Sequence, residues 1–78
     1  MKDIFADRLR ICRENASLTQ TEAAARVGLK KNTYQSYELG TRAPRVVILT
    51  EIAQFYDVST DYLLGRVDDP RPYPRSTQ

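Results

Sequence analysis

An all-α fold is the class that the 78-residue sequence predicts, and two observations predict it. Apolar residues recur at spacings of three and four along most of the chain, with almost no alternation of period two. Glycines and one proline divide these periodic stretches into segments of helical length, at Gly28, Gly40, Pro44 and Gly65. Because a chain this short has room for one small core, we expect a single domain over residues 1–65.

The composition excludes several classes of protein. The N-terminus lacks the apolar stretch of a signal peptide, and no apolar run approaches the roughly 20 residues of a membrane span, so a cytoplasmic location without membrane contact is expected. Cys12 is the single cysteine and histidine is absent, which excludes an internal disulfide and the usual zinc sites. No cofactor or small-molecule ligand is indicated, and no nucleophile has a neighbouring base, so an enzyme is not expected.

The first helix is expected to begin after Asp3, whose carboxylate can cap it. Its apolar positions Phe5, Leu9, Cys12 and Ala16 are spaced at i, i+4, i+7 and i+11, which gives one continuous stripe. Cys12 is therefore interpreted as a core residue. The alternative, a redox-active thiol, requires a partly exposed and activating environment.

The second helix begins with a capping box, in which the Thr19 hydroxyl and the Glu22 carboxylate each accept a free amide of the helix start. The helix is short and ends at Gly28, a residue that readily takes the left-handed conformation. Since only two residues separate it from the next helix, the two helices must cross steeply. Ala24 supplies the small side chain that such a crossing needs.

The third helix is expected over residues 31–39. At 100° per residue, Tyr34 and Tyr37 lie on one side, and we expect them in the core rather than as platforms for stacked bases. The opposite side carries polar residues and one leucine, namely Lys31, Asn32, Gln35, Ser36 and Leu39. The sequence thus predicts a helix that is anchored by tyrosines and presents hydrogen-bonding side chains outward.

Two more helices and a tail complete the predicted chain. The inward stripe of the fourth helix comprises Val46, Leu49, Ile52, Ala53 and Tyr56. Val47 and Ile48 lie off this stripe, where they are either ordinary exposed residues or a surface for a partner. Ser59 can cap a short fifth helix over residues 60–64 that Gly65 ends. Residues 66–78 hold three of the four prolines, so we expect a disordered tail.

The charge is distributed unevenly, although the net charge is only +2. Residues 26–45 carry five basic residues against Glu38 alone, a net of +4, whereas residues 46–69 carry a net of −4. A basic middle segment and an acidic later one indicate a polarised surface that attracts a polyanion on one side. The alternative is a solvated run of charges without a partner.

One set of residues along the chain follows a fixed relative spacing. The set consists of Thr19-Gln20, Ala24, Gly28, Tyr34, Tyr37-Glu38, Gly40, Pro44, Asp57-Val58-Ser59 and Asp61-Tyr62-Leu63-Leu64-Gly65. In these residues the chain resembles the Cro/C1-type helix-turn-helix domain of phage repressors and xenobiotic-response-element-like bacterial regulators, over about residues 5–65. The resemblance implies a five-helix lambda-repressor-like domain whose second and third helices form the helix-turn-helix. It also implies that the third helix enters the DNA major groove, usually in a dimer.

The resemblance assigns roles to individual residues. The positions that face bases in the family are occupied here by Lys31, Asn32, Gln35 and Ser36. Contacts to phosphates are expected from Gln20, Thr21, Lys30 and Arg42. Gln20 also matches a position that braces the recognition helix, and Glu38 is expected to pair inside the domain. The alternative for each polar residue is a solvated surface without a partner.

The chain departs from the family pattern at four positions. Lys30 and Arg45 stand where the family usually has a capping residue, so the third helix is expected to be less well capped, and the start of the fourth helix is left open. Tyr34 is bulkier than the usual aliphatic residue, and Ala23 is smaller than the usual leucine. We hypothesise that these two changes compensate in volume.

The expected function is sequence-specific binding of double-stranded DNA by a small transcriptional regulator, a repressor that acts as a homodimer on a pseudo-palindromic operator. Leu39 and Tyr62 are the expected contacts between subunits. A complete chain would resemble a Cro-like or immunity-type repressor, whereas a fragment would lack part of its regulation. The alternative is a protein-binding module, such as an antitoxin or adaptor, with the same fold.

Overall fold

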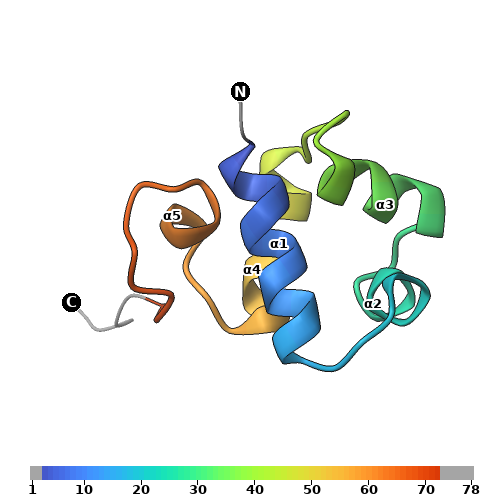
Figure 1. The fold of residues 1–78 in the computed structure, drawn as a ribbon, viewed down its shortest axis with the longest axis horizontal. Helices are drawn as coiled ribbons and strands as arrows, with labels where there is room; N and C mark the ends of the chain where they lie inside the picture. Colours follow the sequence, from blue (N-terminus) through green and yellow to red (C-terminus); the bar gives the residue numbers. More distant parts are fainter. Residues whose placement is uncertain (1–2, 73–78) are drawn as a thin grey trace.

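Five helices make up the described part of the chain, residues 3–72 of a computed structural model, in which no strand occurs. They are α1 (Ile4–Asn15), α2 (Gln20–Arg26), α3 (Lys31–Leu39), α4 (Val46–Tyr56) and α5 (Thr60–Leu63). Figure 1 shows α1 in the middle, with α2 and α3 on one side and α5 on the other. The predicted all-α fold class and the five-helix architecture are confirmed.

The start of α1 is capped as the sequence predicts. The Asp3 side chain accepts a hydrogen bond of 3.0 Å from the Ala6 amide, and Leu9 and Cys12 are buried. The prediction for Ala16 is wrong, because α1 ends at Asn15 and Ala16 is the exposed residue that follows it. The helical spacing therefore no longer places Ala16 on the core side. Burial raises the pKa of the Cys12 thiol, as expected for a core cysteine.

The turn between α2 and α3 has the tight geometry that the sequence indicates. The capping box is complete, and Gly28 takes a positive φ of 74°. The Leu29 amide donates to the Ala24 carbonyl at 2.8 Å, which closes the C-terminal turn of α2. Ala24, the small residue predicted for the crossing, is fully buried, as is Ala23, and α2 packs against α3.

The predictions for α4 are right in its middle and wrong at its start. Leu49, Ile52 and Ala53 are buried, but Val46 is 77% exposed, because it is the first helical residue and no described residue covers it. Ile48 was expected on the outer face. It instead packs against the core, since it lies 100° from Leu49 at the border of the inward face.

The chain after α5 differs from the expectation of a disordered tail that begins at residue 66. Arg8 of α1 donates hydrogen bonds to the Val67 carbonyl at 2.6 Å and to Asp68 at 3.0 Å. The Ser59 amide donates to the Pro70 carbonyl at 3.0 Å. Residues 67–70 are therefore hydrogen-bonded to α1 and to the N-cap of α5, while residues 73–78 lie outside the described residues.

Candidate nucleic-acid interface

The outward side of α3 carries the four residues that the sequence predicts to face bases. We call Lys31, Asn32, Gln35 and Ser36 the polar face of α3. Lys31 and Asn32 are exposed, and within residues 3–72 no side-chain hydrogen bond occupies either of them, whereas Gln35 and Ser36 are half-buried. The Ser36 hydroxyl donates to the Thr33 carbonyl at 2.6 Å, so it remains available only as an acceptor. The N-terminal half of the helix is thus its most accessible part.

The two tyrosines anchor the other side of α3, as predicted. Tyr34 is fully buried, Tyr37 is 6% exposed, and the Tyr37 ring lies edge-on to Phe5 of α1. The Tyr34 and Tyr56 hydroxyls lie 2.7 Å apart, which gives the buried Tyr34 oxygen a partner. Burial, and then this hydrogen bond, raise the pKa of Tyr34 far above its usual range, so the ring remains neutral. Packing thus fixes the orientation of α3 against α1 and α4.

A buried carboxylate connects α3 to the first two helices. The Glu38 side chain is 3% exposed and accepts two hydrogen bonds from Arg13 of α1, at 2.7 Å from Nε and 3.0 Å from Nη2. Arg13 also donates to the Leu18 carbonyl at 2.9 Å. The hydrogen bond to Glu38 raises the pKa of Arg13, which remains charged. Glu38 thus pairs inside the domain, as predicted.

Gln20 joins this cluster from the first turn of α2. Its amide Nε2 donates to Glu38 Oε1 at 3.1 Å, so one side chain of α3 receives bonds from both α1 and α2. We call Arg13, Gln20 and Glu38 the Glu38 network. Gln20 therefore braces α3 as the sequence predicted, and its second amide hydrogen remains available for a phosphate.

The remaining residues with a predicted phosphate contact are exposed and lie in α2 or next to α3 in the chain. Thr21 lies exposed in the first turn of α2, Lys30 precedes α3, and Arg42 lies in the loop after it. Lys30 provides no side-chain cap to α3, as predicted, and Arg45 provides none to α4, which begins at Val46. The first turn of α3 contains no acidic residue, so its free amides and the helix dipole favour an anion there.

Replacing Lys30 with serine is expected to stabilise the domain by about 1 kcal/mol, because a hydroxyl at this position accepts an amide of the first turn. Urea unfolding followed by circular dichroism measures the change. Replacing Lys31 with serine is the matched control, since Lys31 already lies inside the helix and cannot cap it. Equal effects of the two substitutions would contradict the assignment of Lys30 as an uncapped N-cap.

Sequence reasoning predicted an internal partner for Glu38 but did not identify Arg13. A usable signal existed, because Arg13 follows Leu9 by four residues and therefore borders the buried face of α1. Of the two residues expected between subunits, Leu39 is 69% exposed. Tyr62 is half-buried, and the Arg8 guanidinium lies 4.4 Å from the centre of its ring.

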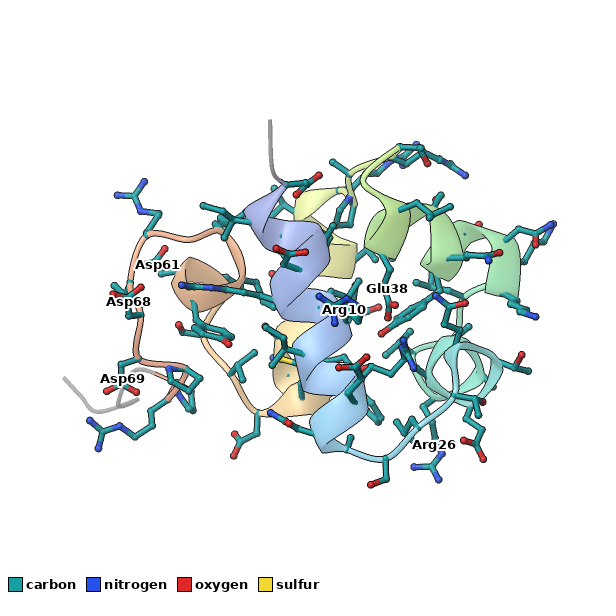
Figure 2. All side chains as sticks on the ribbon, in the orientation of Figure 1. Arg10, Arg26, Glu38, Asp61, Asp68 and Asp69 are labelled. Carbon is teal, nitrogen blue, oxygen red and sulfur yellow. The ribbon has the colours of Figure 1, made fainter. Side chains whose placement is uncertain are left out.

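Acidic residues gather on the side of the molecule away from α3. Figure 2 shows Asp61, Asp68 and Asp69 beside α5 and the chain that follows it, opposite α2 and α3. Each of these three carboxylates forms an ion pair with an arginine, so the polarised surface expected from the charge distribution stays a prediction. Within residues 3–72, no three His, Cys, Asp or Glu side chains come together as a metal site. None of the described helices is both long and apolar enough to cross a membrane.

Comparisons with known proteins agree with this geometry. A helix-turn-helix family model matches residues 9–63. Among curated relatives, the uncharacterized HTH-type transcriptional regulator YobD of Bacillus subtilis is 39% identical over 69 residues, which cover 88% of this chain and 62% of YobD. The HTH-type transcriptional regulator ImmR of the same species is 41% identical over 59 residues, 76% of this chain and 46% of ImmR.

The cryptic phage CTXphi transcriptional repressor RstR of Vibrio cholerae is 38% identical over 55 residues, which cover 70% of this chain and 50% of RstR. The chain thus spans about half to three-fifths of the length of these relatives. The match of the family model includes α2, the turn at Gly28 and α3. By sequence and by fold, the chain belongs to the helix-turn-helix family.

Proposed function

We propose that the chain binds double-stranded DNA sequence-specifically as a small transcriptional regulator, a cytoplasmic repressor that acts as a homodimer on a pseudo-palindromic operator. The observation that carries the proposal is the polar face of α3, which projects from a helix whose other side is fixed in the core. Such a helix can enter the major groove with its N-terminal residues toward the base edges. The names of YobD and RstR, a transcriptional regulator and a repressor, support the proposal.

Within this proposal the residues divide between reading bases and positioning the protein. Lys31 suits the acceptors of guanine, and Asn32 or Gln35 can bind adenine through two hydrogen bonds. Ser36 is a weaker reader, because its proton is given to the Thr33 carbonyl. Phosphate contacts from Gln20, Thr21, Lys30 and Arg42 fix the register of the domain on the duplex.

Homodimerisation belongs to the proposal, because one recognition helix reads too few base pairs for specificity in a genome. Two copies on half-sites about one helical turn apart would double the site. Leu39 is a proposed contact between subunits, and Val46 and Val47 join it, since the three are 69%, 77% and 67% exposed. Tyr62 contributes less, because Arg8 lies over its ring. The same three apolar side chains are the observation that favours the alternative, a protein-binding module.

The test is selection of bound duplexes from a random DNA library, with the wild-type chain and with Lys31→Ala and Gln35→Ala. We expect a two-fold symmetric motif from the wild type and an altered base preference at one position per half-site from each variant. Arg66→Ala is the matched control, because Arg66 follows α5 and pairs with Asp61, away from α3. Its motif should equal that of the wild type.

Salt dependence separates phosphate contacts from base contacts. Binding should weaken steeply with rising salt concentration. Each lost phosphate contact should make the negative slope of log affinity against log salt concentration shallower by about 0.9. Lys30→Ser should show this reduction without changing the motif. Failure to enrich any motif at low salt would reject the DNA-binding proposal and favour a protein partner.

A further inference from the structure

One arginine holds the segment that follows α5. Arg8 Nη1 donates to the Tyr62 and Val67 carbonyls, each at 2.6 Å, and Nη2 donates to Asp68 at 3.0 Å. The same guanidinium lies 4.4 Å from the centre of the Tyr62 ring, a cation–π contact. The Arg8 side chain is only 19% exposed. Its donors are thus directed into the C-terminal segment rather than into solvent.

The held segment borders a pocket of about 340 Å³ between α1, the end of α4 and α5. The residues around the pocket include Cys12, Tyr56, Tyr62 and Pro70. Pro70 is the wall contributed by the segment, and its carbonyl accepts the Ser59 amide at 3.0 Å. Tyr56 also lines the pocket, and its hydroxyl lies 2.7 Å from the Tyr34 hydroxyl of α3. The segment therefore closes one side of a pocket that reaches a core cysteine.

The contacts of this segment differ in kind from those that hold the helices. Val67 is half-buried, residues 68–70 are exposed, and none of these residues belongs to the hydrophobic core. The segment is held by the donors of Arg8 and one backbone hydrogen bond, whereas the helices share a core that includes Leu9, Ile52 and Leu63. Segments with few buried apolar contacts open at a lower free energy than the core.

We propose that residues 67–70 form a strap that Arg8 holds closed over this pocket, and that the strap opens as a local unit while the five helices stay folded. Opening removes Pro70 from the pocket and increases the solvent access of its remaining wall, including Cys12. The strap is thus a conformational device built into the end of the domain. It depends on Arg8 as a forked donor, which lysine cannot replace.

The reaction of Cys12 with a thiol reagent, Ellman's reagent, tests the proposal, because Cys12 is the single cysteine and only 8% exposed. We expect Arg8→Gln to raise the reaction rate about tenfold or more in native buffer, because hydrogen bonds to a charged donor hold the strap. The rate of the variant should depend only weakly on low urea concentrations, as for a local opening. Arg8→Lys should behave like Arg8→Gln.

Arg10→Gln is the matched control on the same helix, since Arg10 contacts only Asp7 and Glu14 among the described residues. Its Cys12 rate should equal that of the wild type. An unchanged rate in Arg8→Gln would overturn the proposal. The proposal would also be overturned if the Cys12 reaction rate of Arg8→Gln were raised but increased with urea concentration as steeply as global unfolding does.

Amide hydrogen exchange of the wild-type chain tests the strap without a substitution. The Ser59 amide, which donates to Pro70, should exchange faster than the Ile52 amide in the middle of α4, and with little dependence on urea. Equal protection and equal urea dependence of the two amides would overturn the local opening. Neither experiment involves DNA, so the outcome is independent of the proposed function.

Discussion

Replacing Glu38 with alanine is expected to lower the free energy of unfolding by about 3–5 kcal/mol, because the substitution leaves a buried guanidinium without its carboxylate. Arg13 is 14% exposed and gives Glu38 two hydrogen bonds, and Gln20 gives a third. A domain of this size is stabilised by about 5–15 kcal/mol in total, so the variant should be close to unfolding. Urea unfolding followed by circular dichroism measures the loss.

Two further variants distinguish the effect of an unpaired buried charge on stability from the effect of lost side-chain packing. Glu14→Ala removes the exposed partner of Arg10, at 3.4 Å, and should cost less than about 1 kcal/mol. The double variant Arg13→Met with Glu38→Leu removes both buried charges and should recover most of the stability that Glu38→Ala loses. If Glu38→Ala cost no more than Glu14→Ala, Glu38 would not be the buried centre of the network.

Much of the fold could be predicted from the sequence, because its signals are local. The cap at Asp3, the capping box at Thr19 and the turn at Gly28 each depend on residues within one helical turn. The anchoring of α3 by Tyr34 and Tyr37 follows from helical spacing alone. The errors concern helix ends. Ala16 and Val46 fit the helical spacing of the apolar stripes, but Ala16 follows the last residue of α1 and Val46 is the first residue of α4, so neither is buried.

The contacts around the candidate site could be predicted only in part, because they join residues far apart in the chain. Glu38 lies 25 residues from Arg13 and 18 from Gln20, and helical periodicity does not identify such partners. Arg8 contacts residues about sixty positions later, in a segment whose prolines and charges indicated disorder. Composition indicates that such a segment has no core of its own. Composition does not exclude that an arginine elsewhere in the chain, here Arg8, fixes the segment by hydrogen bonds.

The pairing of a small Ala23 with a bulky Tyr34 leads to a second large expected effect. Both side chains are fully buried in the same core cluster, Ala23 on α2 and Tyr34 on α3. Ala23→Leu should therefore lower the free energy of unfolding by about 1–3 kcal/mol, because the added volume has no space. Tyr34→Leu should cost about 2–4 kcal/mol, since it leaves a cavity and removes the partner of the Tyr56 hydroxyl.

If the two residues compensate in volume, the double variant Ala23→Leu with Tyr34→Leu should lose less stability than the sum of the single losses, by about 1–2 kcal/mol. Thermal and urea unfolding of the four chains measure this coupling. Ala25→Leu is the matched control, because Ala25 is exposed on the same helix and its replacement should change stability by less than about 0.5 kcal/mol. A higher melting temperature for Ala23→Leu with Tyr34 intact would show that space exists beside Ala23. The tyrosine would then be fixed by its hydroxyl contact with Tyr56 rather than by the small residue on α2.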